Sequence, residues 1–294
     1  MYEKEWVNMH TKIGLVLEGG GMRGLYTAGV LDFFLENKIE FPYVIGVSAG
    51  ACNAASYISK QWGRNKRVNI GFVRDSKYMS FRNLLRKGEL FGMDYVFDVI
   101  PNQIVPFDYE EFKRSETEFV VGTTNCYTGD PVYFGRKDYK EDLLTPIRAS
   151  SSLPFAAPVV TFQGYHLLDG GISDPIPIKK AEQDGCTRNV IVLTQHEGYV
   201  KAPSRLHFLV KRKYAHYPGV VRILENRWKI YNRTLEYIAQ LERGNKVFVI
   251  RPTQSLEVSR VERNQRRLTK LYDLGWQDTA DVYRSLTEWL KTVK

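Results

Sequence analysis

The first clear pattern in the sequence is an apolar run that ends in a cluster of glycines. Residues 12–17 (KIGLVL) read as a buried strand, and Glu18–Gly24 (EGGGMRG) follows at once. Positions 25–37 then place Leu31, Phe34 and Leu35 on one face of a predicted helix. This opening predicts a strand, a glycine-rich loop and a helix.

A second apolar run repeats the pattern with a tighter corner. Residues 43–47 (YVIGV) predict a strand that leads into Gly46-x-Ser48-x-Gly50, and small residues continue as a helix to about Lys60. Two strand–helix units in succession are typical of a parallel sheet covered by helices. We therefore expect an α/β fold in which helices cover a parallel sheet.

The remaining pattern extends the same sheet. Residues 62–117 predict an excursion with short helices, such as Met93–Ile100, over one face of the sheet. Further strands are expected at 118–124, 132–134, 161–168 (a hairpin about Gln163-Gly164), 189–194 and 246–250. Helices are expected at 139–150, broken or restarted by Pro146, at 178–184, at 220–243, and as two charged helices at the end.

Length and composition fit a globular protein, and 294 residues suffice equally for one large α/β domain or for two smaller ones. We expect a single domain over 1–294, with a motif-bearing core at about 12–195 and a basic, mostly helical region at about 200–294. The first residues lack the apolar core of a signal peptide, and no apolar run has the length of a membrane span. Three widely spaced cysteines suit a reducing compartment, so we expect a cytoplasmic protein.

The net charge of +9 is unevenly distributed. Residues 1–200 carry 22 basic and 24 acidic side chains, whereas residues 201–294 carry 20 basic and 9 acidic ones. Such asymmetry indicates a polyanionic partner, either nucleic acid or an anionic membrane surface, or else a set of solvated helix faces. The clearest basic segments are 205–213 and 260–270.

Ser48 is the first candidate for chemistry. A serine on a tight strand-to-helix corner projects its hydroxyl from the sheet edge, at the positive end of a helix dipole. Gly46 and Gly50 remove side chains that would clash with the sharp backbone. The pattern predicts a nucleophile. The alternative is a glycine-flanked turn whose serine has no catalytic role.

The glycine loop has two interpretations. Gly19-x-Gly21-x-x-Gly24 matches the dinucleotide-binding fingerprint and lies between a strand and a helix. That fingerprint needs an acidic residue at the end of the second strand, where this chain has Val47-Ser48, and no Gly-Lys-Ser/Thr follows as a P-loop requires. Consecutive backbone amides can instead form an oxyanion hole next to a serine nucleophile.

A serine nucleophile needs a base. Asp169, at the start of Asp-Gly-Gly at a strand end, is placed to reach Ser48 directly. A triad of Ser48, Asp169 and a later histidine such as His196 has the chain order of α/β-hydrolases, but their nucleophile follows several earlier strands. We expect surface or structural roles for all five histidines, His10, His166, His196, His207 and His216. Of these, His166 stays an alternative base because it lies just before Asp169.

Taken together, these motifs resemble the patatin-like phospholipase family. The resemblance covers roughly residues 12–195 and rests on Glu18–Gly24, Gly46–Gly50 and Asp169–Gly171 in that order, with the block Ala149–Pro158 and Pro175-x-Pro177. The family's loop often begins with Asp where this chain has Glu18. The resemblance implies a three-layer α/β/α fold and a Ser-Asp dyad that hydrolyses acyl esters of lipids without a metal or other cofactor.

The resemblance also implies roles for single residues. Ser48 is the nucleophile and Asp169 the base, and the oxyanion hole is formed by backbone amides of the glycine loop: Gly19, Gly20, Gly21 and Met22. Arg23 either supports that loop or faces a lipid phosphate. The remaining glycines support the loops: Gly24, Gly46, Gly50, Gly170 and Gly171.

A carboxylate is a weak base toward a serine hydroxyl, so the site has to be partly apolar. We expect Leu153, Phe155 and Phe162 to shelter it. We expect the basic C-terminal third to associate peripherally with anionic membrane, and the apolar stripe Leu224–Ile238 to pack against the domain. The predicted function is a phospholipase A-like hydrolase of glycerophospholipid esters, the alternatives being a soluble carboxylesterase or a nucleotide- or nucleic-acid-binding protein. No nucleic-acid motif supports the last.

Overall fold

The computed structural model describes residues 12–204, 207–255 and 257–292. The described chain forms one sheet in the order β5-β6-β3-β2-β1-β7-β8, with β4 also paired to β3. The strands from β3 to β8 along this order are parallel, and β4, β5 and β6 are antiparallel additions. Their bounds are β1 Lys12–Leu17, β2 Tyr43–Val47, β3 Glu118–Asn125, β4 Pro131–Phe134, β5 Val160–Phe162, β6 Tyr165–Asp169, β7 Cys186–Val192 and β8 Val247–Ile250.

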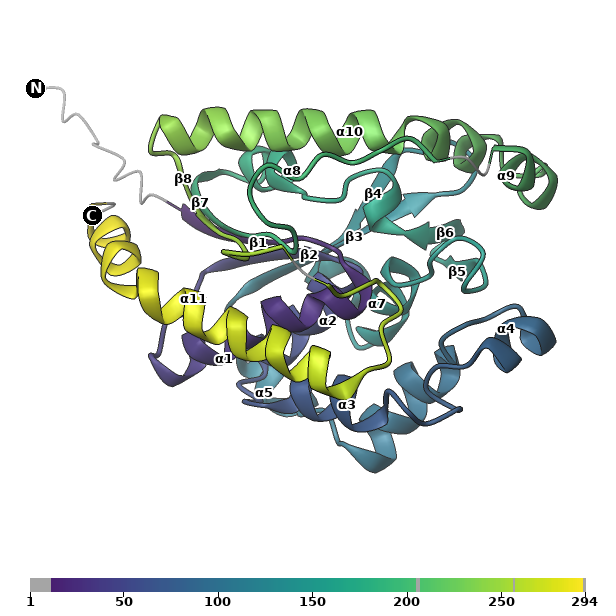
Figure 1. Ribbon diagram of the computed structural model, residues 1–294, viewed down its shortest axis with the longest axis horizontal. Helices are drawn as coiled ribbons and strands as arrows, with labels where there is room; N and C mark the ends of the chain where they lie inside the picture. The colour runs from purple at the N-terminus through teal and green to yellow at the C-terminus, as the bar shows by residue number, and fades with distance from the viewer. Residues whose placement is uncertain (1–11, 205–206, 256, 293–294) are drawn as a thin grey trace, which may run out of the picture.

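Successive side chains along each strand point to opposite faces of the sheet, and helices cover each face. Leu15 and Leu17 of β1 pack in the apolar core shared with helices α1, α2 and α11, while Val16 between them packs with α8 and α10. The view in Figure 1 shows α10 and α8 above the sheet and α1, α2 and α11 below it. The bounds are α1 Gly24–Glu36, α2 Ala49–Ile58, α8 Ile178–Gln183, α10 Pro218–Arg243 and α11 Gln265–Lys291. The predicted three-layer α/β/α architecture is confirmed.

The excursion expected at 62–117 runs beneath the same face as α1 and α2. It consists of α3 Arg64–Phe72, α4 Phe81–Lys87, the π-helical η2 Tyr95–Ile104 and α5 Tyr109–Arg114. The helix expected at 139–150 is two helices, α6 Arg136–Tyr139 and α7 Leu144–Ser150, with Pro146 in the first turn of the second. A first turn tolerates proline because its N–H groups have no helical acceptor.

The two charged helices expected at the end of the chain are one helix, α11, so that prediction was wrong. Gly275 lies inside this helix, at its crossing with α1. A Cβ on Gly275 would lie 2.1 Å from the Tyr26 carbonyl oxygen, and one on Gly29 would lie 2.1 Å from the Tyr272 carbonyl oxygen. The two glycines let the helix backbones approach closely.

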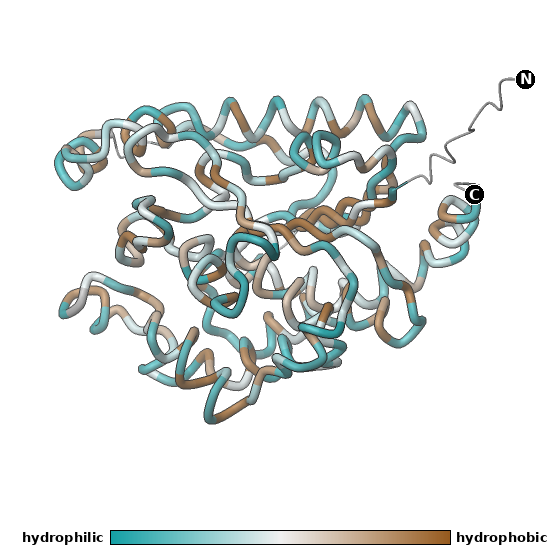
Figure 2. The backbone as a smooth tube through the Cα atoms, turned by 180° about the vertical axis from the view of Figure 1, so that it is seen from behind, coloured by the Kyte–Doolittle hydropathy of each residue, from teal (hydrophilic) through white to brown (hydrophobic). Residues whose placement is uncertain are grey.

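The C-terminal third is built into the fold. Strand β8 pairs in parallel with β7, α11 packs on α1, and α10 covers the opposite face of the sheet. Tyr231 and Ile238 of α10 are buried, as expected for a stripe that packs against the domain. Apolar segments gather in the central strands, and the outer helices are largely hydrophilic (Figure 2). Helix α9, His207–Lys213, and helix α4 both lie at the end of the molecule away from the two termini, on opposite sides of the view in Figure 1.

Candidate active site

Ser48 lies on a strained corner between β2 and α2. Its backbone has φ +54° and ψ −126°, and its carbonyl accepts the Cys52 N–H at 3.2 Å as α2 begins. A Cβ on Gly46 would lie 2.7 Å from the Ala51 nitrogen, and one on Gly50 would lie 2.5 Å from the Leu17 carbonyl oxygen. Glycine is therefore required on both sides of the serine, which explains the Gly-x-Ser-x-Gly pattern.

Ser150 at the end of α7 fixes this corner from a distant part of the sequence. The Ser48 N–H donates to Ser150 Oγ at 2.7 Å, and Ser150 Oγ donates to the Gly122 carbonyl of β3 at 2.6 Å. All of these atoms are buried. Sequence reasoning placed Ser150 only within a block of small residues, because nothing in that block shows which hydroxyl reaches the corner.

Asp169 is brought to the same place by the sheet register. Val47 of β2 pairs with Gly122 of β3, and Asp169 at the end of β6 pairs with the next β3 residue, Thr123. The ends of β2 and β6 therefore lie beside consecutive residues of one strand. Both Ser48 and Asp169 are buried, with 5% and 1% of their surface exposed.

The Asp169 carboxyl is held on one oxygen only. Oδ1 accepts the Gly171 N–H at 2.7 Å, whereas Oδ2 has no hydrogen-bond partner among the described residues. Burial raises the pKa of Asp169, and the Ser48 hydroxyl and the Arg227 guanidinium pull it partly back. Ser48 is thus a neighbour of the carboxyl, although the pair does not meet hydrogen-bond geometry in this structure. Direct transfer of the serine proton to Asp169 requires that hydrogen-bond geometry.

The glycine loop contacts the serine from the neighbouring strand. Leu17 of β1 pairs with Gly46 of β2, and a Cβ on Gly19 would lie 3.1 Å from the Ser48 Cβ. The Gly19 N–H donates to Pro175 and the Met22 N–H to the Arg260 carbonyl at 3.1 Å.

Two amides of this loop remain available. Within the described chain, the N–H groups of Gly20 and Gly21 donate no hydrogen bond. Gly21 has φ +57°, a conformation that favours glycine. Of the four residues predicted for the oxyanion hole, these two have free donors.

The side chains of Glu18 and Arg23, at the two ends of the glycine loop, differ in their hydrogen-bond partners. The buried Glu18 carboxylate accepts the Thr194 N–H at 2.6 Å and the Tyr231 hydroxyl at 2.8 Å, so it joins the end of β1 to α10. Arg23 is half-buried and its Nε has no hydrogen-bond partner among the described residues. Burial lowers the pKa of Arg23, and the neighbouring Arg260 lowers it further.

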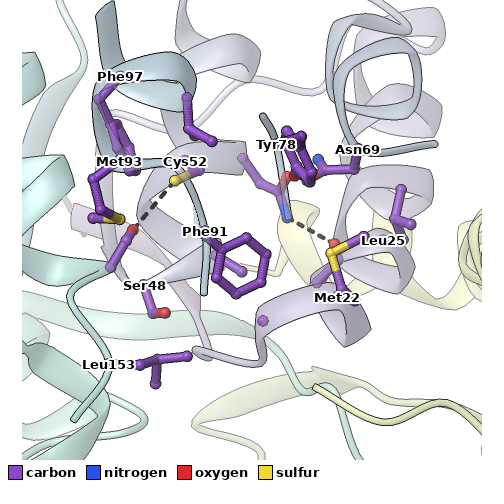
Figure 3. A pocket seen from close by; sticks show the side chains of 16 residues that line it. Met22, Leu25, Ser48, Cys52, Asn69, Tyr78, Phe91, Met93, Phe97 and Leu153 are labelled. Carbon is purple, nitrogen blue, oxygen red and sulfur yellow. Dashed lines mark hydrogen bonds between the residues drawn. The ribbon is translucent and has the colours of Figure 1, made fainter. Parts of the chain in front are cut away.

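An apolar pocket opens beside Ser48, and we call it the serine pocket. Figure 3 shows the Ser48 side chain among Phe91, Met93, Phe97 and Leu153, in a cavity of about 90 Å³. The three residues from 91 to 97 come from the excursion that sequence reasoning left without a role. Of the side chains expected to shelter the site, Leu153 lines this pocket.

The other two expected side chains lie elsewhere. Phe155 lines an adjoining cavity, and the ring of Phe162 packs against Phe134 at 5.1 Å. The expectation that they enclose the serine directly was therefore wrong. Phe162 belongs to β5, and its ring contacts Phe134 of β4.

No histidine with a described side chain lines the serine pocket. His166 Nδ1 lies 2.9 Å from the Tyr217 hydroxyl, and His196 Nδ1 lies 2.6 Å from the Glu197 carbonyl oxygen. His216 is exposed. His10 and the side chain of His207 lie outside the described residues. A histidine base at Ser48 thus receives no support from the three that are described.

Two further observations concern ions and membranes. In residues 12–204, 207–255 and 257–292, no group of three or more His, Cys, Asp or Glu side chains is arranged to hold a metal ion. In the same part of the chain, none of the helices combines the length and the apolar character needed to cross a bilayer.

Known protein families and sequences resemble this chain. A family model described as "Patatin-like phospholipase" matches residues 15–181, and one described as a domain of unknown function (DUF6363) matches residues 217–291. An uncharacterized protein of Escherichia coli K12, YjjU, is 33% identical over 202 residues, which are 67% of this chain and 54% of YjjU. The lysophospholipase NTE1 of Scheffersomyces stipitis is 28% identical over 178 residues, 59% of this chain and 11% of that enzyme.

The fold has a solved counterpart. The crystal structure of VipD from Legionella pneumophila matches with a TM-score of 0.52 and 11% identity, covering 94% of this chain and 67% of VipD. This chain thus corresponds to about half of YjjU and to a small part of NTE1.

Proposed function

The chain belongs to the patatin-like phospholipase family, and from this premise we propose that it hydrolyses carboxylic esters of glycerophospholipids through a Ser48–Asp169 dyad. One observation carries the proposal: a serine on a strained corner, a buried carboxylate with one free oxygen and two free loop amides converge beside an apolar pocket. Lysophospholipase activity, which the name of NTE1 states for that enzyme, is the same class of reaction.

The first half of the reaction forms an acyl-serine. Asp169 takes the proton of the Ser48 hydroxyl as Oγ attacks the ester carbonyl carbon. The oxygen of the tetrahedral intermediate carries the negative charge and accepts hydrogen bonds from the Gly20 and Gly21 amides. When the intermediate collapses, the C–O bond to the leaving alcohol breaks, and that alcohol takes the proton from Asp169.

The second half releases the acid. A water molecule gives a proton to Asp169 while its oxygen attacks the acyl carbon, and the same amides hold the new oxyanion. Collapse breaks the bond to Ser48 Oγ, which recovers a proton from Asp169. The carboxylate can serve as base because burial raises its pKa. The cycle uses no cofactor.

The substrate class is the point to test first. We expect purified protein to hydrolyse micellar phospholipid faster than a short-chain soluble ester, and Ser48→Ala to abolish both reactions. Equal turnover of both substrates would favour a soluble carboxylesterase. Turnover that survives in Ser48→Ala would contradict the proposed nucleophile.

We also propose a cytoplasmic protein that binds anionic membrane peripherally. Phe81 and Leu85 on α4 are 61% and 88% exposed, and Phe208 on α9 is 76% exposed. Basic residues lie among them, Arg82 and Arg86 on α4 and Lys211, Arg212 and Lys213 on α9. Each basic side chain near an anionic surface contributes about 1 kcal/mol. The segment 205–206 of the predicted basic patch lies outside the described residues.

A single substitution tests the membrane face. Leu85→Ser is expected to weaken binding to phosphatidylserine vesicles in a sedimentation assay severalfold. Trp62→Ser is the control. Trp62 is also a large exposed side chain, 57% exposed, but it lies outside α4 and α9, and its indole N–H donates to Glu36 at the end of α1. Equal binding by the two variants and the unaltered protein would show that α4 does not contact the membrane.

A further inference from the structure

A second cavity adjoins the serine pocket on the other side of Leu153. It has a volume of about 270 Å³ and combines apolar walls with three cations. We call it the cationic cavity, and its defining residues are Leu153, Ile172, Trp228, Lys201, Arg227 and Arg260. Leu153 lines both cavities, so a ligand with its ester at Ser48 has an apolar space on one side and a charged one on the other.

The three cations converge from separate parts of the chain. Arg227 lies on α10, Lys201 follows β7, and Arg260 lies between β8 and α11. None of them forms an ion pair within the described part of the chain. Glu225 also lines the cavity, and Lys211 lies 3.7 Å from its carboxylate. Like charges held together at one cavity indicate an anionic ligand.

Burial and the repulsion between neighbouring cations lower the pKa of two of these groups, Lys201 and Arg227. Burial, together with Arg227, Arg260 and Arg23, lowers the pKa of Lys201 to about 7, and Glu18 offsets part of this. Burial, Arg260 and Arg23 lower the pKa of Arg227 to about 10, against the opposing effect of Asp169. An anion in the cavity would relieve this repulsion.

The cavity is joined directly to both catalytic loops. Arg227 Nε donates to the Gly171 carbonyl at 2.6 Å, two residues beyond Asp169. The Arg260 carbonyl accepts the Met22 N–H at 3.1 Å, next to the free amides of the glycine loop. The terminal nitrogens of Arg227 donate no hydrogen bond within the described chain and can meet a phosphate side by side.

We propose that Lys201, Arg227 and Arg260 bind the phosphate group of the substrate while its ester carbonyl lies at Ser48. The assignment rests on the proposed function and deepens it, because it makes a phosphate-bearing acyl ester the preferred substrate over a neutral glyceride. The glycerol unit spans Leu153, the acyl chain enters the serine pocket, and the phosphate enters the cationic cavity.

The test compares two substrates that differ only in the phosphate-bearing headgroup. We measure kcat/KM for lysophosphatidylcholine and for the monoacylglycerol with the same acyl chain, and take their ratio as selectivity. Lys201→Met is expected to lower this ratio about tenfold, the effect of losing one charge-assisted hydrogen bond. Arg260→Gln provides a second variant whose backbone carbonyl is unaltered. Arg222→Gln, an exposed α10 residue near Asp130, is the matched control and keeps the ratio of the unaltered protein.

The pH dependence gives an independent readout. Lys201 is a cation below its pKa of about 7 and neutral above it, so selectivity for the phospholipid should fall as the pH rises through 7. Lys201→Arg stays charged and should flatten this profile. The change in protonation of Asp169 affects both substrates and cancels in the ratio.

Inorganic phosphate separates a headgroup site from a regulatory one. At a headgroup site, added phosphate competes with lysophosphatidylcholine and raises its KM, and Lys201→Met weakens the competition. If phosphate instead changes the kcat for monoacylglycerol in the unaltered protein but not in Lys201→Met, the cavity binds free phosphate and the headgroup assignment is overturned. A selectivity ratio that is the same in Lys201→Met, Arg260→Gln and the unaltered protein would also overturn it.

A separate outcome concerns the proposed function. If the unaltered protein hydrolyses neither substrate, the proposed function is contradicted, and calorimetric binding of glycerol phosphate would then test the cavity alone.

Discussion

Removing the hydroxyl of Ser150 should damage the active site more than its distance in the sequence from Ser48 suggests. In Ser150→Ala, the Ser48 N–H loses its acceptor and the Gly122 carbonyl loses a donor, and both groups remain buried. Each buried polar group left unsatisfied costs about 1–3 kcal/mol, so the free energy of unfolding should fall by about 3 kcal/mol. The backbone of Ser48, held at φ +54°, would also lose the contact that fixes it.

Relaxation of this corner moves the nucleophile. A displacement of about 1 Å can lower turnover about a hundredfold, and we expect a decrease in kcat of that order in Ser150→Ala. Ser152→Ala is a matched control, since Ser152 is equally buried but its hydroxyl donates only to the Arg148 carbonyl of the preceding helix, α7. In that variant the free energy of unfolding should fall by at most about 1 kcal/mol, and kcat should be unchanged.

Urea unfolding followed by circular dichroism measures the first effect, and turnover of a saturating ester substrate measures the second. A Ser150→Ala protein with the stability and kcat of Ser152→Ala would refute the reasoning. It would show that the strained corner holds its conformation through Gly46, Gly50 and the start of α2 alone.

Two further predictions concern the base and the helix crossing. Only the carboxylate form of Asp169 accepts the serine proton, and burial raises the pKa of this group. As the pH is lowered, kcat/KM should therefore already fall at a pH above the usual aspartate pKa of about 3.9. A profile that stays flat down to that value would contradict the assignment of Asp169 as the base. Gly29→Ala would place a Cβ 2.1 Å from the Tyr272 carbonyl oxygen and should destabilise the protein by about 1–3 kcal/mol in urea unfolding. Gly71→Ala in α3 meets open space and should be neutral or slightly stabilising, so equal effects of the two would exclude a close crossing.

The parallel core of the fold could be predicted because each strand carries a short apolar run followed by a distinct loop. The strand at residues 12–17 and that at 43–47 have the predicted bounds, and the hairpin about Gln163-Gly164 spans 160–169 where 161–168 was predicted. The long terminal helix could not be predicted in one piece. Gly275 lies inside that helix, and its role is set by a close contact with Tyr26 of α1, which is far away in the sequence.

The residues of the candidate site also fall into two groups, those that a local sequence pattern predicts and those that only tertiary contacts reveal. Ser48, Asp169 and the glycine loop carry local sequence patterns, and the sheet register brings them together. Ser150 and the aromatic wall of the serine pocket act only through tertiary contacts. The occupied amide of Met22 depends on the carbonyl of Arg260, and no pattern around either residue shows that contact.

The most direct measurement of the central claim is mass spectrometry of the protein after reaction with a fluorophosphonate ester probe. We predict one adduct on Ser48, none in Ser48→Ala, and labelling slowed by orders of magnitude in Asp169→Asn. His166→Ala and His196→Ala should label at the rate of the unaltered protein. Rapid labelling of Asp169→Asn, or a histidine variant that labels slowly while folded, would contradict a dyad in which Asp169 alone is the base.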